Sequence, residues 1–178
     1  RARGPVDATI TLPGSKSLTN RALVLAALAD GPSVVRRALR SRDTTLMAGA
    51  LAALGTRIDA SGDDWVVTPE PLAGDAQVDC GLAGTVMRFV PPVAGLSAGV
   101  VAFDGDAHMR SRPIGEILSA LRVLGVDVED GGRGAFPFQV RRAGGVPVGT
   151  AVFDASASSQ SVSALLLAGP RYDAGVDV

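Results

Sequence analysis

Apolar and polar residues change their spacing several times within the first seventy positions of the chain. At the start, Val6, Ala8, Ile10 and Leu12 alternate with polar residues, which is the period of a β-strand. An Ala- and Leu-rich stretch with helical spacing follows. The pattern therefore predicts, in order, a strand at 6–12, a helix at 18–29, a strand at 33–37, a helix at 43–54 that Gly55 ends, and strands at 58 and 65–67.

The same order of elements recurs seventy residues later. Arg-Ser-Arg at 40–42 recurs at 110–112, and Gly-Ser at 14–15 aligns with Gly-Thr at 84–85. The second copy predicts helices from Thr85 and over 113–124, and strands near 100–103, 126 and 138. A third copy begins at 154–160. The unit is βαβαββ, with repeats at about 13–75, 83–145 and, incompletely, 154–178, and such units bury their helices against one another.

Composition and charge narrow the classes of function. The 178 residues are 47% apolar with a formal net charge of −1, which gives no sign of a nucleic-acid or membrane partner. Prolines and glycines interrupt the apolar stretch at 89–103 before it reaches the ~18 residues of a spanning helix. One cysteine and no signal peptide predict a soluble, cytoplasmic protein. Because the chain opens on Arg1 and stops within a strand-like pattern at 175–178, we expect it to be part of a longer protein.

The densest group of polar residues lies at 13–21, Pro-Gly-Ser-Lys-Ser-Leu-Thr-Asn-Arg, where the first predicted strand turns into a helix. Helix N-termini leave backbone N–H groups unpaired and carry the positive end of the dipole, so they attract anions. Lys16 and Arg21 add charge, and Lys16 is the only lysine among 17 basic residues. A compact ammonium can fit between two anions where a guanidinium cannot. The alternative is a Ser-capped helix with two solvated cations; the Gly-Lys spacing excludes a nucleotide P-loop.

Two further junctions repeat this arrangement. At 80–88, glycines would let a ligand approach the backbone and Arg88 follows one turn into the helix, with a plain tight turn as the alternative. Arg112 comes just before Pro113, a first-turn residue, and is favoured as a ligand over its counterpart Arg42, which the neighbouring Asp43 could neutralise. At 155–160, hydroxyls and an amide again begin a helix, with an ordinary Ser-rich cap as the alternative.

The chain carries four motifs in order: Pro-Gly-Ser-Lys-Ser followed by Asn20-Arg21, Gly-Leu-Ala-Gly-Thr-Val-Met-Arg at 81–88, Arg-Pro-Ile at 112–114 and Ser-Ser-Gln at 158–160. Together they resemble the 5-enolpyruvylshikimate-3-phosphate synthase family, most of all its actinobacterial members. The resemblance implies an inside-out α/β barrel with helices inward and sheets outward. It further implies that residues 1–178 form most of the N-terminal domain of a two-domain enzyme, with the C-terminal domain absent.

The activity that the resemblance implies is transfer of the enolpyruvyl group of phosphoenolpyruvate to the 5-hydroxyl of shikimate 3-phosphate, with release of phosphate, in the shikimate pathway of aromatic amino acid biosynthesis. Lys16 would contact both substrates and act in catalysis. Shikimate 3-phosphate would be bound by Lys16, Ser17, Arg21, Ser158, Ser159 and Gln160. Phosphoenolpyruvate would be bound by Lys16, Gly84, Arg112 and Gln160, with Thr85 and Arg88 as further candidates. Neither a metal nor an organic cofactor is implied, and the full-length parent is expected to be a monomer.

Two alternatives stay open: a UDP-N-acetylglucosamine enolpyruvyl transferase-like enzyme on the same fold, and a substrate-binding fragment without activity of its own. The family often has Asn at the position of Leu82, so a polar contact to phosphoenolpyruvate would be missing or supplied by the backbone. The acidic base of the family lies in its C-terminal half. We do not expect Asp43, Asp104 or Asp106 to replace that base, and we expect structural roles for His108 in a loop, buried Cys80 and strand-packed Trp65.

The repeat also makes a geometric prediction. The helices that begin near Ser15, Thr85 and Ser158 occupy equivalent places in consecutive units, so their N-termini should converge on one face. The residues expected to line a single cleft are Lys16, Gly84, Arg112 and Gln160, whereas Arg36, Arg57 and Arg141 should lie away from it.

Overall fold

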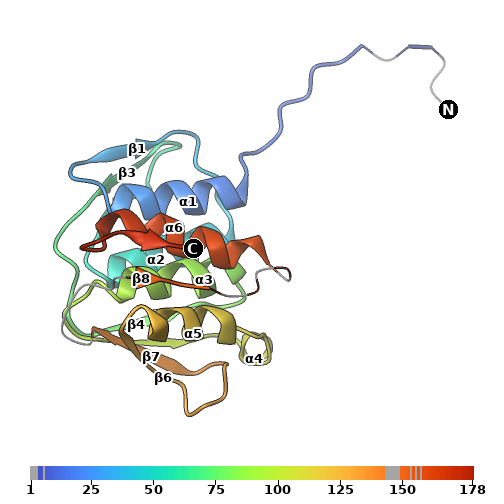
Figure 1. The fold of residues 1–178 in the computed structure, drawn as a ribbon. Helices are drawn as coiled ribbons and strands as arrows, with labels where there is room; N and C mark the ends of the chain where they lie inside the picture. Colours follow the sequence, from blue (N-terminus) through green and yellow to red (C-terminus); the bar gives the residue numbers. More distant parts are fainter. Residues whose placement is uncertain (1–3, 6, 143–148, 153, 155, 157) are drawn as a thin grey trace.

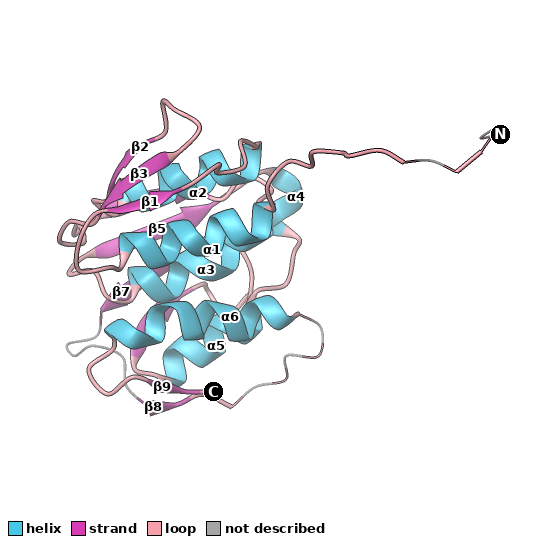
Figure 2. Ribbon diagram, turned by 90° about the horizontal axis from the view of Figure 1, so that it is seen from above, coloured by secondary structure: helices cyan, strands magenta, loops and turns pink. Residues whose placement is uncertain are grey.

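The helices of the protein lie side by side in its interior, and the β-sheets lie outside them (Figure 1, Figure 2). The computed structural model describes residues 4–5, 7–142, 149–152, 154, 156 and 158–178. Helices inward and sheets outward confirm the predicted α/β class. The helices are α1 (Lys16–Ala27), α2 (Arg42–Ala53), α3 (Gly84–Ala94), α4 (Ala107–Arg110), α5 (Gly115–Val123) and α6 (Ser159–Ala168), with a 3-10 turn, η1, at Gly169–Arg171.

Helix α3 is the centre of the helical layer. Nine of its eleven residues are buried, and it contacts α1, α2 and α6. A helix that is apolar on every side is stable only inside a core. Pro91 and Pro92 lie within α3 and remove two backbone donors. The carbonyl oxygens of Met87 and Arg88 thereby lose their helical donors. Near the end of α3, the buried hydroxyl of Tyr172 donates to the carbonyl oxygen of Pro92 at 3.0 Å, which the N–H of Leu96 leaves free by bonding to Val93.

Three sheets repeat one topology. The first has the order β1-β3-β2, the second β4-β5-β7-β6, and the third pairs β8 with β9. The antiparallel part β5-β7-β6 matches β1-β3-β2, and the parallel pair β4 and β5 matches the parallel pair β8 and β9. The strands are β1 (Ser33–Val35), β2 (Arg57–Asp59), β3 (Trp65–Thr68), β4 (Ala76–Asp79), β5 (Val100–Asp104), β6 (Val126–Glu129), β7 (Phe138–Arg142), β8 (Gly149–Thr150) and β9 (Val176–Asp177).

The predicted strand at 6–12 is wrong for the residues that the structure describes. Positions 7–12 run away from the body of the protein as an extended segment (Figure 1), and the side chains of Ile10 and Leu12 are 79% and 78% exposed. Alternation produces a strand only where a neighbouring strand supplies hydrogen bonds. In the second repeat β5 pairs with β4, the strand that precedes it. The first-repeat equivalent of β5 is β1, which pairs, among the described residues, with β3 alone.

Short local signals set the ends of the helices. Ser15 caps α1 by accepting from the backbone N–H of Leu18 at 3.4 Å, and Ser41 forms a capping box with Thr44 on α2. Gly55 follows α2 with φ 103°, a conformation that other residues rarely adopt, as the sequence predicted. A Cβ atom at Gly55 would also approach the carbonyl oxygen of Pro71 at 2.9 Å.

The residues predicted to be structural behave as expected. Trp65 is 2% exposed on β3, and the guanidinium of Arg40 lies over its ring at 5.7 Å. Cys80 is fully buried, and its pKa is raised by that burial and by the carboxylates of Asp79 and Asp104, so the reactive thiolate is disfavoured. His108 is exposed, but it lies on the short helix α4 rather than in the expected loop. Within the described ranges, every helix is too short or too polar to cross a membrane.

Candidate functional site

Helices α1, α3 and α6 begin at the same end of the protein (Figure 1, Figure 2). The free N–H groups and positive dipole ends of three helices are therefore gathered on one side. The convergence predicted from the repeat is confirmed. Side chains from these helices also meet: Asn20 on α1 contacts Thr85 on α3, and Arg21 on α1 contacts Ser163 on α6.

Lys16 is the first residue of α1, and its side chain is 49% exposed. Its ammonium lies 2.8 Å from the carboxylate of Asp43, in the first turn of α2. The expected neutralisation of Arg42 by Asp43 is wrong, because Arg42 reaches Asp106 at 2.7 Å instead. Residues adjacent in a helix point in different directions, so a sequence neighbour is a poor guide to an ion pair. Exposed ion pairs exchange easily, so the Lys16 ammonium remains accessible to an anion.

Arg21 is held without a carboxylate among the described residues. Its guanidinium donates to the carbonyl oxygen of Ser17 at 3.3 Å and to the hydroxyl of Ser163 at 3.0 Å, and lies 5.0 Å from the ring centre of Phe89. These contacts fix the orientation of the guanidinium and leave its charge uncompensated. Sequence reasoning missed Ser163; only its place one turn after Ser159, facing α1, identifies it.

Gly84, Arg88 and Arg112 form a compact cluster at the start of α3. A Cβ atom at Gly84 would lie 3.3 Å from both terminal nitrogens of Arg112 and 3.4 Å from Nη1 of Arg88. Arg88 donates to the carbonyl oxygen of Gly84 and Arg112 to that of Leu82, both at 3.4 Å. The missing side chain at Gly84 thus lets two guanidinium groups approach one stretch of backbone.

The electrostatics of this cluster favour an anion. Burial lowers the pKa of Arg88, the like charge of Arg112 lowers it further, and the carboxylate of Glu116 opposes both effects. Two neighbouring guanidinium groups repel each other, and a negative group placed between them offsets this repulsion. Phosphate and carboxylate match the planar donors of arginine.

The start of α6 supplies hydroxyl and amide groups. Ser158 accepts from the backbone N–H of Gln160 at 3.3 Å and so acts as the helix cap. Ser159 is exposed, and Gln160 is half-buried. Thr85, named above as a further candidate ligand, is 3% exposed, and its hydroxyl accepts from Asn20. Thr85 therefore belongs to the support of the site, whereas Ser159 and Gln160 remain accessible to a ligand.

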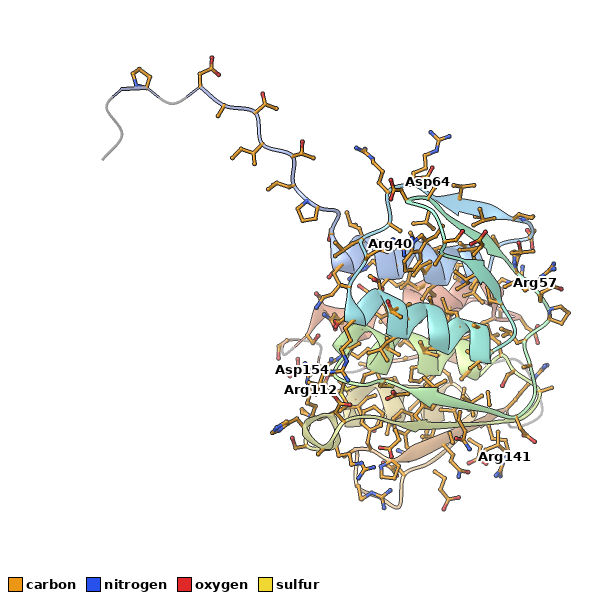
Figure 3. The ribbon with its side chains drawn as sticks, turned by 180° about the vertical axis from the view of Figure 1, so that it is seen from behind. Arg40, Arg57, Asp64, Arg112, Arg141 and Asp154 are labelled. Atoms are coloured by element: carbon orange, nitrogen blue, oxygen red, sulfur yellow. The ribbon has the colours of Figure 1, made fainter. Side chains whose placement is uncertain are left out.

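Two of the three arginines expected outside the site lie elsewhere (Figure 3). Figure 3 shows Arg112 at one end of the protein and Arg57 and Arg141 at the opposite end. Arg36, by contrast, lines a groove of about 700 Å³ with Gly14 and Ser15, nearer to the start of α1 than expected.

The single cleft stays a prediction. Of the four residues expected to line it, Gly84 and Arg112 are in contact. A hollow of about 1010 Å³ lies over the β4-β5-β7-β6 sheet instead, and none of the four lines it.

Three of the carboxylates near the site are already engaged by cations, whereas Glu116 accepts a hydrogen bond from Ser161 at 3.4 Å. Asp43 pairs with Lys16, Asp106 with Arg42, and Asp104 with Arg110 at 2.6 Å. The hydrogen bond from Arg110 lowers the pKa of Asp104, with help from the backbone of Gly105 and against the effect of burial. A carboxylate with a lowered pKa is a weak base. In the described part of the chain, no three His, Cys, Asp or Glu side chains gather as metal ligands would.

Known proteins share both the sequence and the fold. The profile of the EPSP synthase (3-phosphoshikimate 1-carboxyvinyltransferase) family matches residues 1–178. The chain is 54% identical to the 3-phosphoshikimate 1-carboxyvinyltransferase of Kocuria rhizophila over 183 aligned positions, and 54% identical to that of Mycobacterium ulcerans over 182. These alignments cover 97% and 98% of the chain but 41% of each relative.

Solved structures agree at the level of the fold. Two structures of EPSP synthase from Acinetobacter baumannii superpose with TM-scores of 0.73 and 0.75, at 24% identity and over 90% of the chain. The chain covers 38% and 37% of those two proteins. The inside-out architecture is therefore that of EPSP synthases, and with the profile match over its whole length the chain belongs to the EPSP synthase family.

Proposed function

We propose that the chain supplies the anion-binding half of an enzyme that transfers the enolpyruvyl group of phosphoenolpyruvate to the 5-hydroxyl of shikimate 3-phosphate and releases phosphate. One observation carries the proposal. Arg88 and Arg112 meet at Gly84, and Arg21 lies in the second turn of α1 against the ring of Phe89 on α3. Within the described residues none of the three forms an ion pair with a carboxylate. Both substrates carry phosphate and carboxylate groups, which such a surface binds.

The two clusters suit the two substrates. The slot between Arg88 and Arg112, open because position 84 is glycine, fits the anionic groups of phosphoenolpyruvate. Arg21 on α1 donates to Ser163 on α6, one turn after Ser159, and Ser17 lies one turn before Arg21. This side, with Ser158, Ser159 and Gln160 at the start of α6, fits shikimate 3-phosphate. Lys16 stands at the head of α1 with an exchangeable partner, which suits a contact shared by both substrates.

The chemistry follows from the charges involved. The terminal carbon of phosphoenolpyruvate gains a proton while the 5-hydroxyl group gives up its proton to a base and its oxygen bonds to the neighbouring carbon, the one that bears the phosphate. The tetrahedral adduct then loses phosphate and a proton from the same terminal carbon, which restores the double bond. Fixed cations stabilise the negative charge that gathers on the carboxylate and the leaving phosphate. We place the proton-transferring base outside residues 1–178, as the family resemblance implies, and do not assign that role to Asp43, Asp104 or Asp106, which are paired with cations.

A chimera tests the proposal. This chain replaces the matching segment of the Kocuria rhizophila relative, with which it shares 54% identity, and phosphate release is followed with each substrate alone and with both. We expect release only with phosphoenolpyruvate and shikimate 3-phosphate together, and none from the 178-residue chain by itself. A folded chimera that instead uses UDP-N-acetylglucosamine as acceptor, or that binds neither substrate, would overturn the assignment.

A further inference from the structure

A single hydrogen bond joins the two cation clusters through the core. Asn20, in the second turn of α1, is fully buried, and its Nδ2 donates to Oγ1 of Thr85, in the first turn of α3, at 2.6 Å. The side-chain oxygen of Asn20 is also buried and has no partner among the described residues. Half of this amide is therefore satisfied and half is not.

An asparagine at this buried position lowers the stability of the fold relative to an apolar residue. Seventy residues later, the equivalent position in the second repeat is Val90, which is fully buried in α3. The fold thus accepts a hydrocarbon side chain at this place. A buried amide oxygen without a partner costs free energy that an apolar side chain of similar size would not. The contribution of Asn20 must be sought in something other than stability.

The neighbours of the bond indicate what it positions. Asn20 stands between Lys16, one turn earlier on α1, and Arg21, the next residue. Thr85 follows Gly84 directly and precedes Arg88 by less than one turn. The bond thus connects the part of α1 that carries Lys16 and Arg21 with the first turn of α3, where Gly84 lies beside the guanidinium groups of Arg88 and Arg112.

We infer that Asn20 is a positioning residue: it fixes α3 against α1 so that the groups for phosphoenolpyruvate stand at a set distance from those for shikimate 3-phosphate. The inference rests on the proposed function. Transfer between two bound substrates requires the reacting atoms to meet, and a misplacement of about 1 Å can lower the rate about 100-fold. A buried bond resists such a shift better than exposed ion pairs do.

The test compares stability with catalysis in the chimera. Asn20→Leu removes the amide at nearly constant volume, and Thr85→Val removes the hydroxyl while Thr85→Ser keeps it. We expect Asn20→Leu to unfold at the same temperature as the unmodified chimera or higher, yet to lose roughly tenfold or more in kcat/KM for phosphoenolpyruvate. Thr85→Val should lose a similar factor, Thr85→Ser should retain most activity, and the double variant should be little worse than either single one.

Other outcomes separate the inference from the function on which it rests. Full activity of both Asn20→Leu and Thr85→Val would overturn the inference and leave the proposed function intact. A loss of activity that follows a loss of stability would also overturn it, since Asn20 would then be a structural residue. If Asn20→Leu does not fold, the pair Thr85→Val and Thr85→Ser decides the question alone. If the unmodified chimera has no transfer activity, the proposed function itself fails. The phosphate-release assay on that chimera shows this before any variant is made.

Discussion

Nine arginines of this protein form two groups that are held in different ways. In the described part of the chain, six arginines pair with carboxylates at 3.3 Å or less: Arg42, Arg57, Arg110, Arg122, Arg141 and Arg171. At the N-terminal end of the helices, the contacts of Arg21, Arg88 and Arg112 are backbone carbonyl oxygens, one hydroxyl and an aromatic ring. A carbonyl orients a guanidinium but carries no net charge to cancel it.

Neutral partners alone do not mark a binding residue, because the described hydrogen bonds of Arg40 and Arg133 also go to carbonyl oxygens. What distinguishes Arg21, Arg88 and Arg112 is that they combine neutral partners with a place near the helix N-termini. Paired arginines tie loops and strands together, and their carboxylate partners cancel most of their contribution to the local potential. Oriented but unpaired arginines keep their full charge beside three helix N-termini, in a chain whose net charge is −1. Lys16 lies between the two cases, because its partner Asp43 is at 2.8 Å but the lysine side chain is half exposed. The predictions below alter one group or the other, from the largest expected effect to the smallest.

Lys16 should be the most sensitive position for catalysis. In the chimera, Lys16→Met is expected to lower kcat/KM by about 100- to 1,000-fold, the range found when one stabilising donor is removed from a transition state. Lys16→Arg should fail nearly as badly, because a rigid fork cannot replace a compact ammonium between two anions. Steady-state phosphate release measures both. Activity of Lys16→Arg close to that of the unmodified chimera would mean that the single lysine has no special role.

Asp130 should be the most important carboxylate for stability. It is 3% exposed, and it accepts from the backbone N–H groups of Gly132 and Gly134 and from Arg122 at 2.8 Å. Asp130→Ala leaves these donors unpaired and should lower the free energy of unfolding by about 3 kcal/mol, measured by denaturant titration. Asp127→Ala is the matched control, because its pair with Arg141 is half exposed and should contribute under about 1 kcal/mol.

The pH dependence of Asp130 gives a second readout. Burial raises its pKa, but the hydrogen bonds from Gly134 and Gly132 and the charge of Arg122 outweigh this and lower it below the usual value. The stabilisation is therefore complete above the unfolded pKa of about 4 and disappears as the pH falls through the lower folded value. The difference in unfolding free energy between wild type and Asp130→Ala should be constant near neutral pH and shrink in acid. A difference that grows in acid would contradict the assigned contacts.

A carboxylate placed beside Arg112 should convert it into a paired arginine. Leu82 is 41% exposed, and its carbonyl oxygen accepts from Arg112. Leu82→Asp in the chimera is expected to raise the KM for phosphoenolpyruvate by roughly tenfold, about 1.4 kcal/mol, by competing for the guanidinium. Leu82→Asn has the same shape without the charge and should leave KM unchanged or lower it. Equal effects of the two variants would show that the charge of Arg112 is not what binds the substrate.

Exposed paired arginines should have the smallest effects. Arg141→Gln and Arg57→Gln remove ion pairs in which both arginine side chains are more than half exposed. Each should change the unfolding free energy by less than about 1 kcal/mol and leave both KM values unaltered. A tenfold change in either KM would place these residues in the binding surface, against their position at the far end of the molecule in Figure 3.

Local sequence signals predicted much of the fold. Hydrophobic spacing and the seventy-residue repeat identified both helices of the first unit, the antiparallel strands and the helix starts near Ser15 and Ser158, because caps and periodicity act within a few residues. The segment 7–12 has the right alternation but no neighbour among the described residues, so its spacing alone could not predict pairing. Strand formation depends on residues distant in sequence.

The candidate site was likewise predictable only in part: the motifs indicated its residues but not their contacts. The motifs indicated Lys16, Arg21, Gly84 and Arg112, since anion-binding helix starts combine glycine, hydroxyls and cations locally. The partners of these residues could not be predicted: Asp43 for Lys16 and Ser163 for Arg21 depend on how helices pack. The contact between Asn20 and Thr85 spans 65 residues, and no local pattern indicates it.

Binding of shikimate 3-phosphate to the 178-residue chain tests the central claim most directly, because it needs neither turnover nor the remaining part of the family's length. Isothermal titration compares the wild-type chain with Arg21→Gln and Arg141→Gln, which remove one unpaired and one paired guanidinium. We predict weak binding that Arg141→Gln leaves unchanged and that Arg21→Gln weakens at least tenfold, about 1.4 kcal/mol. Equal affinity of the wild type and Arg21→Gln, or equal losses in the two variants, would contradict the claim that the unpaired arginines are the anion site.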